Sequence, residues 1–306
     1  MILIVGGEEE FHAKYIYDKL VQKNEKAVFF DTRKIPNDIT ISWNASDRDF
    51  KNGYFKIGGQ KIFFSDINSV YWRNHYGYSQ PLAQGFPELQ YLLQREITSA
   101  FNSVFKSSDW LWCNSINAIE MHKNKTFQLN LMAQNNIRVP KTLITNNKED
   151  IKEFFINNDK KIIFKPVLGG AHTQKFTEEM LKDEDLKTLI NSPVQFQEMI
   201  NGVDIRVYVI GQDIFAAKIV AETLDFRADE NAKIIPIELP QNIKDYCLQI
   251  MQLFELNYSG IDIRLTEEGE YVFIEANPAP MFVHFERQSG YPISDTLIEM
   301  LCCGKM

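Results

Sequence analysis

Three side chains near the carboxyl end of the chain have the types and spacing that suit a magnesium site. Asp262, Glu275 and Asn277 lie in the segment GIDIRLTEEGEYVFIEANP, which predicts two strands joined by a turn at 267–269. Residues two apart in a strand share a face, and pairing across the turn brings Asp262 beside the other two. Magnesium prefers such oxygen ligands and takes its remaining ones from water and phosphate. The segment therefore predicts a site for a nucleotide triphosphate held with magnesium.

An alternative is that Asp262 and Glu275 lie on the solvent face of an edge hairpin. The neighbouring residues Ile261, Ile263 and 272–274 are apolar, however, and this indicates a strand pair that is mostly buried. An unpaired carboxylate is costly in such surroundings. Two buried carboxylates that face each other need a cation, which favours the metal interpretation.

Lys165 is the second candidate group. It ends the apolar run IIFK and leads into Gly169-Gly170. Backbone N–H groups of a glycine-rich loop can surround a phosphate while a lysine neutralises it. The Walker pattern GxxxxGK[ST] is absent from the chain. Taken alone, the segment favours a solvated lysine beside a plain turn.

The elements that must position these groups begin with a β-α-β unit. Apolar runs at 2–5 and 27–30 flank a helical pattern at 11–21, which predicts the start of a buried parallel sheet. Gly6-Gly7 lacks the third glycine of a dinucleotide loop, and the acidic residues 8–10 would repel a pyrophosphate. We interpret Gly6-Gly7 as a structural turn.

The rest of the chain predicts a mixed α/β (α+β) fold. Short alternating runs between about 39 and 73 predict a small antiparallel element with a hairpin turn at Gly58-Gly59, followed by helices at 86–105 and 118–135. The later predicted elements are strand 142–145, helix 149–156, strand 161–166, helix 178–189, strands 194–200, 204–211 and 213–221, helix 242–256, the hairpin 260–278 and helix 293–300.

Composition limits the classes of function. The 306 residues are 44% hydrophobic and 24% charged, which predicts a chain folded throughout into two or three subdomains. A net charge of -8 argues against general binding to nucleic acid or to anionic membranes. The four cysteines have no zinc-site spacing, and the N-terminal apolar run is too short for a signal peptide. We therefore expect a cytoplasmic protein, with a homodimer as the default assembly.

Four segments in this order resemble the ATP-grasp enzymes: FKP-x2-GG, QEMI, DIRVYVIG and GIDIRLTEEGEYVFIEANP. The resemblance runs from Ala118 onward and is to the RimK-like branch, which includes the graspetide synthetases that crosslink ribosomally made peptides. SVYWR and FERQSGYPISDTLIEML are also similar to that branch. The resemblance implies an N-terminal parallel α/β (pre-ATP-grasp) subdomain at 1–112, a central subdomain at 113–194 and a C-terminal antiparallel-sheet subdomain at 195–306.

The resemblance also implies roles for individual residues. Lys165 and Lys125 match lysines that touch phosphate, and Arg206 matches an arginine near the transferring phosphate. Further matches are Gln197, Glu198, Met199 and Ile200 for the hinge that receives adenine, Asp204 for the residue near the ribose, and Asp262, Glu275 and Asn277 for the magnesium ligands. Candidates for holding the substrate are Lys218, Arg227, His284 and Glu286.

Each of these residues has a simpler structural alternative. Lys125 could be an exposed helix lysine, and Glu198 and Asp204 could be solvated strand charges. Arg206 could pair with either of those two acids, Arg227 could pair with Asp225 at the surface, and His284 could be a buried core histidine. The presence of all these residues in one chain, in the order found in the family it resembles, favours the functional interpretation.

The implied activity is that of an ATP-dependent carboxylate–amine or carboxylate–hydroxyl ligase. ATP and two magnesium ions would serve formation of an acyl-phosphate, with Lys165 and Arg206 as the catalytic groups. The expected substrate is a ribosomally made peptide or a protein. The alternatives are a ligase for small amino acids and a nucleotide-binding module without turnover, and the full set of candidate ligands argues against the latter.

Overall fold

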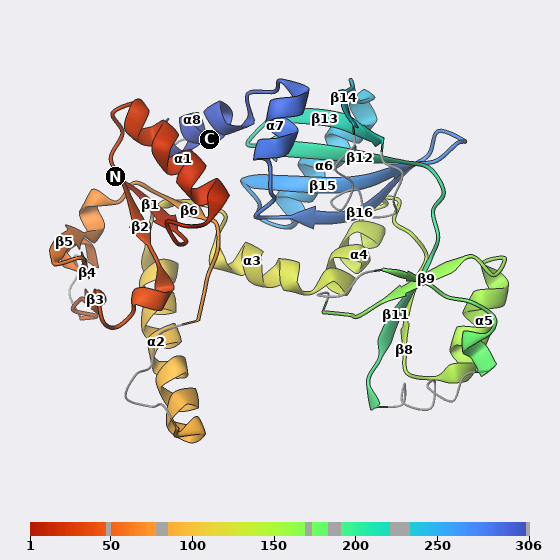
Figure 1. Cartoon of the computed structure of the whole chain (residues 1–306), viewed down its shortest axis with the longest axis horizontal. Coiled ribbons are helices and arrows are strands. Elements are labelled where there is room, and N and C mark those ends of the chain that lie inside the picture. Colours follow the sequence, from red (N-terminus) through yellow and green to blue (C-terminus); the bar gives the residue numbers. More distant parts are fainter. Residues whose placement is uncertain (47–49, 78–84, 169–172, 183–190, 221–232, 304–306) are drawn as a thin grey trace.

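Figure 1 shows the computed structural model of the chain, in which residues 1–46, 50–77, 85–168, 173–182, 191–220 and 233–303 are described. Within these ranges the strands form four sheets, one of them parallel. The mixed α/β architecture predicted from the sequence is confirmed.

The N-terminal sheet is parallel, in the order β2-β1-β6-β7. Its strands are β1 (Ile2–Val5), β2 (Ala27–Phe30), β6 (Ser69–Trp72) and β7 (Leu111–Cys113). Every residue of β1 and β6 is buried, because helices cover both faces of the sheet. One face packs against α1 (Phe11–Gln22) and α8 (Ile293–Cys303), and the other against α2 (Pro87–Ser107).

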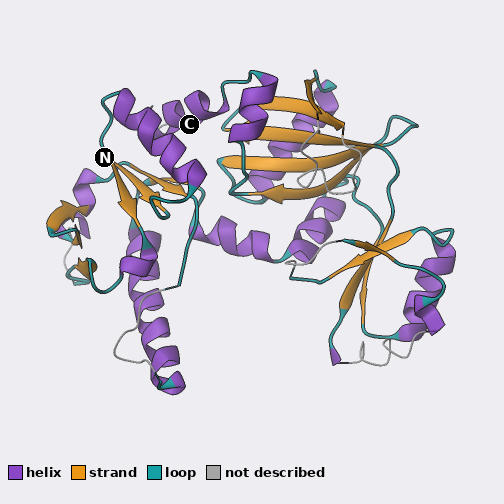
Figure 2. Ribbon diagram, viewed as in Figure 1, coloured by secondary structure: helices purple, strands orange, loops and turns teal. Residues whose placement is uncertain are grey.

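A small antiparallel sheet decorates this unit and consists of β3 (Ile39–Ser42), β4 (Tyr54–Ile57) and β5 (Gln60–Phe63). Its turn at Gly58-Gly59 is the predicted one. The N-terminal half of α2 extends away from the sheets, as Figure 2 shows. Only Phe101, Val104 and Phe105 of that helix are buried, and all three lie in its last two turns.

The single helix predicted at 118–135 is wrong. The structure has α3 (Ile116–Lys123) and α4 (Lys125–Gln134), which meet at Asn124. The side-chain oxygen of Asn124 accepts a hydrogen bond from Phe127 N at 3.2 Å. Asparagine is a favoured N-cap, so this residue starts a new helix where the apolar periodicity alone continues the old one.

A four-stranded antiparallel sheet follows, in the order β10-β9-β11-β8. Its elements are β8 (Thr142–Thr145), α5 (Lys148–Asn157), β9 (Ile162–Lys165), β10 (Gln174–Lys175) and β11 (Val194–Glu198). Helix α5 packs against the face that carries Phe164 and Phe196, so Lys165 and Gln197 lie on the other face. Of the helix predicted at 178–189, the structure describes a 3-10 turn at Met180–Lys182, and residues 183–190 lie outside the described ranges.

The largest sheet is antiparallel, in the order β14-β13-β12-β15-β16. Its strands are β12 (Val203–Ile210), β13 (Asp213–Val220), β14 (Lys233–Pro236), β15 (Tyr258–Leu265) and β16 (Tyr271–Asn277). Helix α6 (Gln241–Leu253) packs on one face, and α7 (Val283–Ser289) and α8 pack on the other. The sequence predicts neither β14, which is short and ends in a proline, nor α7, which has seven residues and no side-chain N-cap.

One hydrophobic core joins the N-terminal sheet to the largest sheet. It contains Ile2 and Ile4 of β1, Tyr208 of β12, and residues of α1 and α8. Figure 1 shows α1 and α8 side by side in this position, whereas the sheet of β8 to β11 stands apart. No helix in the described ranges has the length and apolar character needed to cross a bilayer.

Candidate functional site

A row of three charged residues crosses the largest sheet. Glu275 of β16 pairs with Asp262 of β15, and Asp262 pairs with Arg206 of β12. Cross-strand partners point to the same side, so the three side chains lie together. The pairing of Asp262 with Glu275 is as the sequence predicts, and Asn277 lies two residues further along the same face of β16.

Arg206 is 7% exposed, and its Nη1 donates to Asp262 Oδ1 at 2.5 Å. Its guanidinium carbon lies 5.1 Å from the centre of the Tyr208 ring. The ion-pair partner of Arg206 is therefore Asp262, whereas the simpler alternative named Glu198 or Asp204. A Cβ atom at Gly260 would come within 2.5 Å of Arg206 Nη2, so only glycine leaves room for the guanidinium there.

Two lysines approach the same carboxylates from other elements. Lys125, the first residue of α4, donates to Glu275 Oε2 at 2.6 Å. Lys165, the last residue of β9, has its Nζ 3.5 Å from Gln197 Oε1. Burial lowers the pKa of Lys165, while the charge of Glu275 acts in the opposite direction. The charge of Glu275 therefore acts on both lysines that are predicted to contact phosphate.

The two carboxylates are not equivalent. Burial raises the pKa of Asp262, and repulsion from Glu275 adds to the increase in spite of Arg206. Burial also acts to raise the pKa of Glu275, but the charge and hydrogen bond of Lys125 outweigh it and lower that pKa. Buried acids that face each other are stabilised by added positive charge. The electrostatics therefore favour a cation beside both of them.

The donor set fits magnesium bound with phosphates. It offers two carboxylates and the amide oxygen of Asn277, which also accepts from Ala279 N at 2.9 Å. In the described part of the chain, no three His, Cys, Asp or Glu side chains form a group that could hold a metal without other ligands. Magnesium commonly binds one or two carboxylates and completes its shell with phosphate and water, so this set is sufficient.

The predicted adenine hinge is anchored by its own polar contacts. Gln197 donates to Thr142 Oγ1 at 2.9 Å. Glu198 accepts from Lys141 N at 2.7 Å and pairs with Arg138 at 3.0 Å. The carboxylate of Glu198 therefore stabilises the end of β11.

The remaining hinge residues are held by contacts from the sheet of β8 to β11 and from the largest sheet. Met199 N donates to Lys161 O at 2.9 Å. Arg264 donates to Ile200 O at 3.3 Å and pairs with Asp204 at 2.6 Å. Gly202 has φ +151°, and a Cβ atom there would meet Leu265 O at 2.1 Å. The connection between β11 and β12 thus has a defined path.

Of the predicted substrate residues, the three that lie in the described ranges are not brought to the row of Arg206, Asp262 and Glu275. Lys218 pairs with Ile205, the neighbour of Arg206, and alternation puts it on the opposite face of the sheet. His284 is exposed on α7, where its ring lies 3.1 Å from Gln288. Arg227 lies outside the described residues.

Glu286 has a structural position between helices. It accepts from Tyr15 Oη at 2.8 Å and from Ser294 Oγ at 2.9 Å. These contacts tie α7 to α1 and α8. Tyr15 lies 271 residues from Glu286, so the segment HFERQ alone carries no signal for that contact.

Several residues that shape the site were not predicted from the sequence. Gln128 and His122 contact the backbone of Ala276, between Glu275 and Asn277. Asn114 donates to Pro278 O at 2.7 Å, and Arg73 donates to Ala279 O. Arg73 ends the segment SVYWR, which was noted only as a resemblance. All four act on the strand that carries the predicted metal ligands, or on the loop after it.

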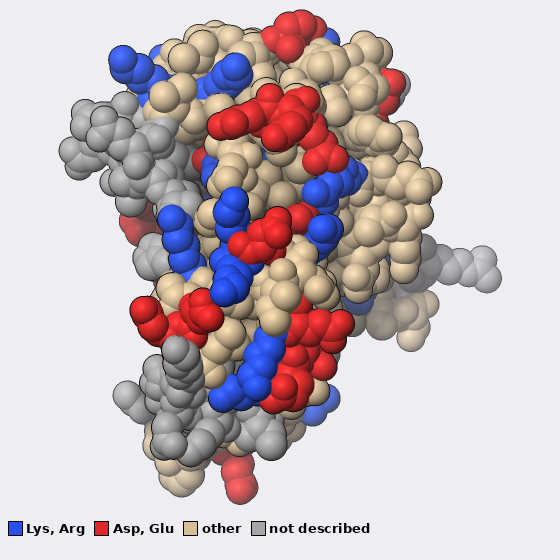
Figure 3. All heavy atoms as spheres, turned by 90° about the vertical axis from the view of Figure 1, so that its right-hand side faces the viewer, with Lys and Arg blue, Asp and Glu red and all other residues tan. Residues whose placement is uncertain are grey.

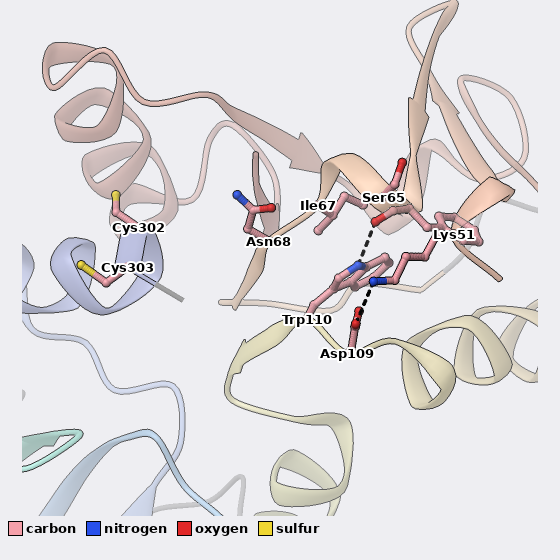
Figure 4. Close-up of a pocket in the computed structure, with 9 residues that line it drawn as sticks. Lys51, Ser65, Ile67, Asn68, Asp109, Trp110, Cys302 and Cys303 are labelled. Atoms are coloured by element: carbon pink, nitrogen blue, oxygen red, sulfur yellow. Dashed lines mark hydrogen bonds and ion pairs between the residues drawn. The ribbon is translucent and has the colours of Figure 1, made fainter. Parts of the chain in front are cut away.

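A hollow of about 300 Å³ lies beside the N-terminal sheet, at the end of the sheet where its strands begin. Figure 4 shows Lys51 paired with Asp109 beside Trp110, with Cys302 and Cys303 further along. Ligands of parallel sheets bind at the carboxyl ends of the strands, so a ligand is not expected at this end of the sheet. Figure 3 shows the side of the molecule that is at the right in Figure 1, where basic and acidic side chains lie next to one another among the coloured residues.

Comparison with known proteins matches residues 122–301 to the RimK-like ATP-grasp domain. The alpha-aminoadipate–LysW ligase LysX of Sulfurisphaera tokodaii is 22% identical over 243 residues, 74% of this chain and 85% of LysX. The ATP-grasp ligase PsnB, complexed with a phosphomimetic variant of a minimal precursor, Mg and ADP, is 28% identical with TM-score 0.84, over 99% of this chain and 98% of PsnB. The macrocyclase MdnC of Microcystis aeruginosa MRC, bound with precursor peptide MdnA, is 25% identical with TM-score 0.85, over 98% of each chain.

The matched family covers more than half of the chain, and it includes Lys125, Lys165, Asp262, Glu275 and Asn277. The likeness to PsnB and MdnC extends over the N-terminal sheet as well. The resemblance predicted from the sequence is therefore confirmed, and the chain belongs to the RimK-like ATP-grasp family and is an ATP-grasp ligase.

Proposed function

We propose that this ligase modifies a ribosomally made peptide or protein by forming an amide or ester through an acyl-phosphate. The observation that carries the proposal is the likeness along nearly the whole chain to PsnB and MdnC, each solved with a precursor peptide. The LysX match covers less of the chain.

ATP is proposed to bind between the sheet of β9 and β11 and the largest sheet. The hinge at 197–200 would receive adenine, mainly through its backbone because Glu198 is already paired, and Asp204 would lie near the ribose. Lys165 and Lys125 would neutralise the phosphates. Asp262, Glu275 and Asn277 would hold magnesium, which supplies charge neutralisation of the phosphates when bound. We propose two ions, because two carboxylates share the site.

The chemistry then depends on positioning and charge. A substrate carboxylate oxygen attacks the γ-phosphorus, and the bond to the β-phosphate oxygen breaks to release ADP. An amine or hydroxyl next attacks the acyl carbon, the bond to phosphate breaks, and the nucleophile loses its proton. Lys165 and Arg206 would stabilise the negative charge that develops in the first step. No side-chain nucleophile is needed.

A second candidate is a ligase for small amino acids. It is favoured by the curated relatives, which include LysX and the tetrahydromethanopterin:alpha-L-glutamate ligase of Methanocaldococcus jannaschii, 26% identical over 61% of this chain and 69% of the relative. Both candidates share the first step and differ in the acceptor. Whether Lys218, Arg227, His284 or Glu286 contacts that acceptor stays a prediction.

We also propose the division into units at 1–112, 113–194 and 195–306, a homodimeric assembly and a cytoplasmic location. The division is supported by three separate main sheets, although β7 crosses the first boundary and β11, which belongs to the central sheet, extends beyond the second to Glu198. The location is supported by four cysteines without a disulfide. The homodimer rests on the frequency of such assemblies alone.

The deciding experiment measures ADP release with Mg-ATP against two panels. One contains short peptides encoded beside the gene and rich in Thr, Ser, Glu or Asp, and the other contains free amino acids. Peptide-dependent ADP release with loss of one water per new bond supports crosslinking. A product heavier by one amino acid establishes the second candidate, and ADP binding without turnover in either panel contradicts the proposed ligation of these substrates. Lys165→Met serves as the control, since it should lose nucleotide binding.

A further inference from the structure

The strand that carries Glu275 and Asn277 lies at the edge of its sheet. β16 pairs with β15 on one side, and on the other side no strand of the described residues follows it. An edge strand presents backbone N–H and C=O groups that need other partners. Ala276, between the two predicted ligands, is buried and directs its N–H and C=O to this free side.

Gln128 of α4 supplies the partners for Ala276. Its Oε1 accepts from Ala276 N at 3.1 Å, and its Nε2 donates to Ala276 O at 3.1 Å. One side-chain amide thus makes the two hydrogen bonds that a neighbouring strand would make. The side chain is 2% exposed, so water does not compete for these contacts.

His122 completes the arrangement at the same carbonyl. Its Nδ1 lies 3.0 Å from Ala276 O, and because a carbonyl oxygen only accepts, Nδ1 carries the proton in this contact. The amide nitrogen of Gln128 is 3.1 Å from the same ring nitrogen, so the two side chains pack together. Further along the edge, Phe273 N donates to Arg138 O at 2.8 Å. The segment from α3 to Arg138 therefore covers the free edge.

The position of Gln128 on α4 links two parts of the site. Lys125 lies three residues earlier, which is about one helical turn, so it is on the same side of the helix. From there it donates to Glu275 Oε2. The helix therefore contacts Glu275 through its side chain and Ala276 through its backbone. A shift of β16 along α4 would break both contacts at once.

We propose that Gln128 is a positioning residue, which fixes Glu275 and Asn277 relative to Lys125 and thereby sets the affinity of the magnesium site. This inference rests on the proposed function, because it takes Glu275 and Asn277 as magnesium ligands and Lys125 as a contact to phosphate. Residues that orient metal ligands typically change metal affinity or activity by about 10–100-fold when replaced. A residue that only seals the strand edge would change stability without changing the magnesium requirement.

The test compares Gln128→Met with Gln134→Met, the same substitution at the exposed end of the same helix. Three quantities are measured for each and for the parent: the Mg²⁺ concentration at half-maximal ADP release, the Kd for ADP at fixed Mg²⁺ by calorimetry, and the unfolding temperature without ligands. We expect Gln128→Met to raise the Mg²⁺ midpoint and the Kd at least about 10-fold. Gln134→Met should match the parent in all three.

A lower unfolding temperature with an unchanged Mg²⁺ midpoint and Kd would overturn the inference. If Gln128→Met does not fold, Gln128→Asn replaces it, since it keeps an amide that is one methylene too short to reach both groups of Ala276. A folded Gln128→Asn with the parent's midpoint would overturn the inference equally. Absence of magnesium-dependent ADP binding in the parent would overturn the proposed nucleotide site as well as the role of Gln128. Measuring the parent therefore distinguishes failure of the proposed function from failure of this inference.

Discussion

Arg206, Asp262 and Glu275 show which contacts of single residues a sequence can reveal. A short turn sets the register between Asp262 and Glu275, so their pairing follows from strand alternation. Arg206 lies on β12, far along the chain, and no turn links its register to that of β15. The ion pair between Arg206 and Asp262 therefore depends on tertiary structure and could not be predicted.

Glu275→Gln should reduce ADP release by at least about 10²-fold, because it removes a negative ligand while keeping its volume. Lys125 would also lose its partner. The fold should remain, since the glutamine still fits on β16. ADP release and the unfolding temperature are measured together, with the exposed Glu270→Gln as the matched control. Parent-like ADP release by Glu275→Gln contradicts the assignment of Glu275 as a metal ligand.

At the scale of elements, long strands and helices could be predicted and their interruptions could not. Residues 204–211 and 213–221 have clear apolar patterns and form β12 and β13 with nearly those bounds. The break between α3 and α4 depends on one capping asparagine, and α7 has only seven residues. The contacts of Gln128 follow from that break, because it sets the direction of α4 against β16.

The connection between β11 and β12 is short and has one residue that must be glycine. Gly202→Ala should destabilise the protein by about 1–3 kcal/mol, because it adds an unfavourable φ and a contact with Leu265 O. The substitution should also raise the KM for ATP, because the contact with Leu265 O would displace the hinge at 197–200 that is proposed to receive adenine.

Gly211→Ala separates the two causes. Gly211 also has positive φ, +56°, but a Cβ atom there meets nothing within 4 Å. This control should lose stability and keep the KM of the parent. Urea unfolding and ATP-dependent ADP release are the measurements, and an unchanged KM in Gly202→Ala would show that the hinge does not position the nucleotide.

At the scale of the whole molecule, Asn114 links the N-terminal sheet to the largest sheet. Its amide nitrogen donates to Tyr258 O and Pro278 O, each at 2.7 Å, and its oxygen accepts from Asn257 N and Tyr258 N. The residue is fully buried. Sequence alone gives no reason to single it out, since all its partners are backbone groups over 140 residues away.

Asn114→Ala should lower the free energy of unfolding by on the order of 3 kcal/mol, because several buried backbone groups lose their partners together. Asn158→Ala, which removes one hydrogen bond to Phe154 O, is the comparison. Denaturant titration measures both. Equal losses in the two variants would show that the contacts of Asn114 do not stabilise the junction of the two sheets.

His12 predicts a pH dependence for the same junction. It packs on Phe282 at 5.1 Å between ring centres, and burial, together with the charge of Arg73, lowers its pKa from 6.5 to about 4. The unfolded chain therefore binds this proton first as the pH falls. Stability from His12 is complete above pH 6.5 and decreases toward pH 4, by about 2 kcal/mol at pH 5. The parent should show this decrease in denaturant titrations, and His12→Asn should lack it.

The contacts of Asn114 and Arg73 across this junction have an evolutionary consequence. Their partners in the C-terminal half are main-chain carbonyl groups, which every residue type provides, and main-chain N–H groups, which every residue type except proline provides. Substitutions on that half can accumulate without altering these contacts. A hybrid enzyme that takes its N-terminal sheet from a distant relative should therefore keep these two contacts if the donor supplies an arginine and an asparagine at these two places, whereas the side chains of the shared hydrophobic core must still match.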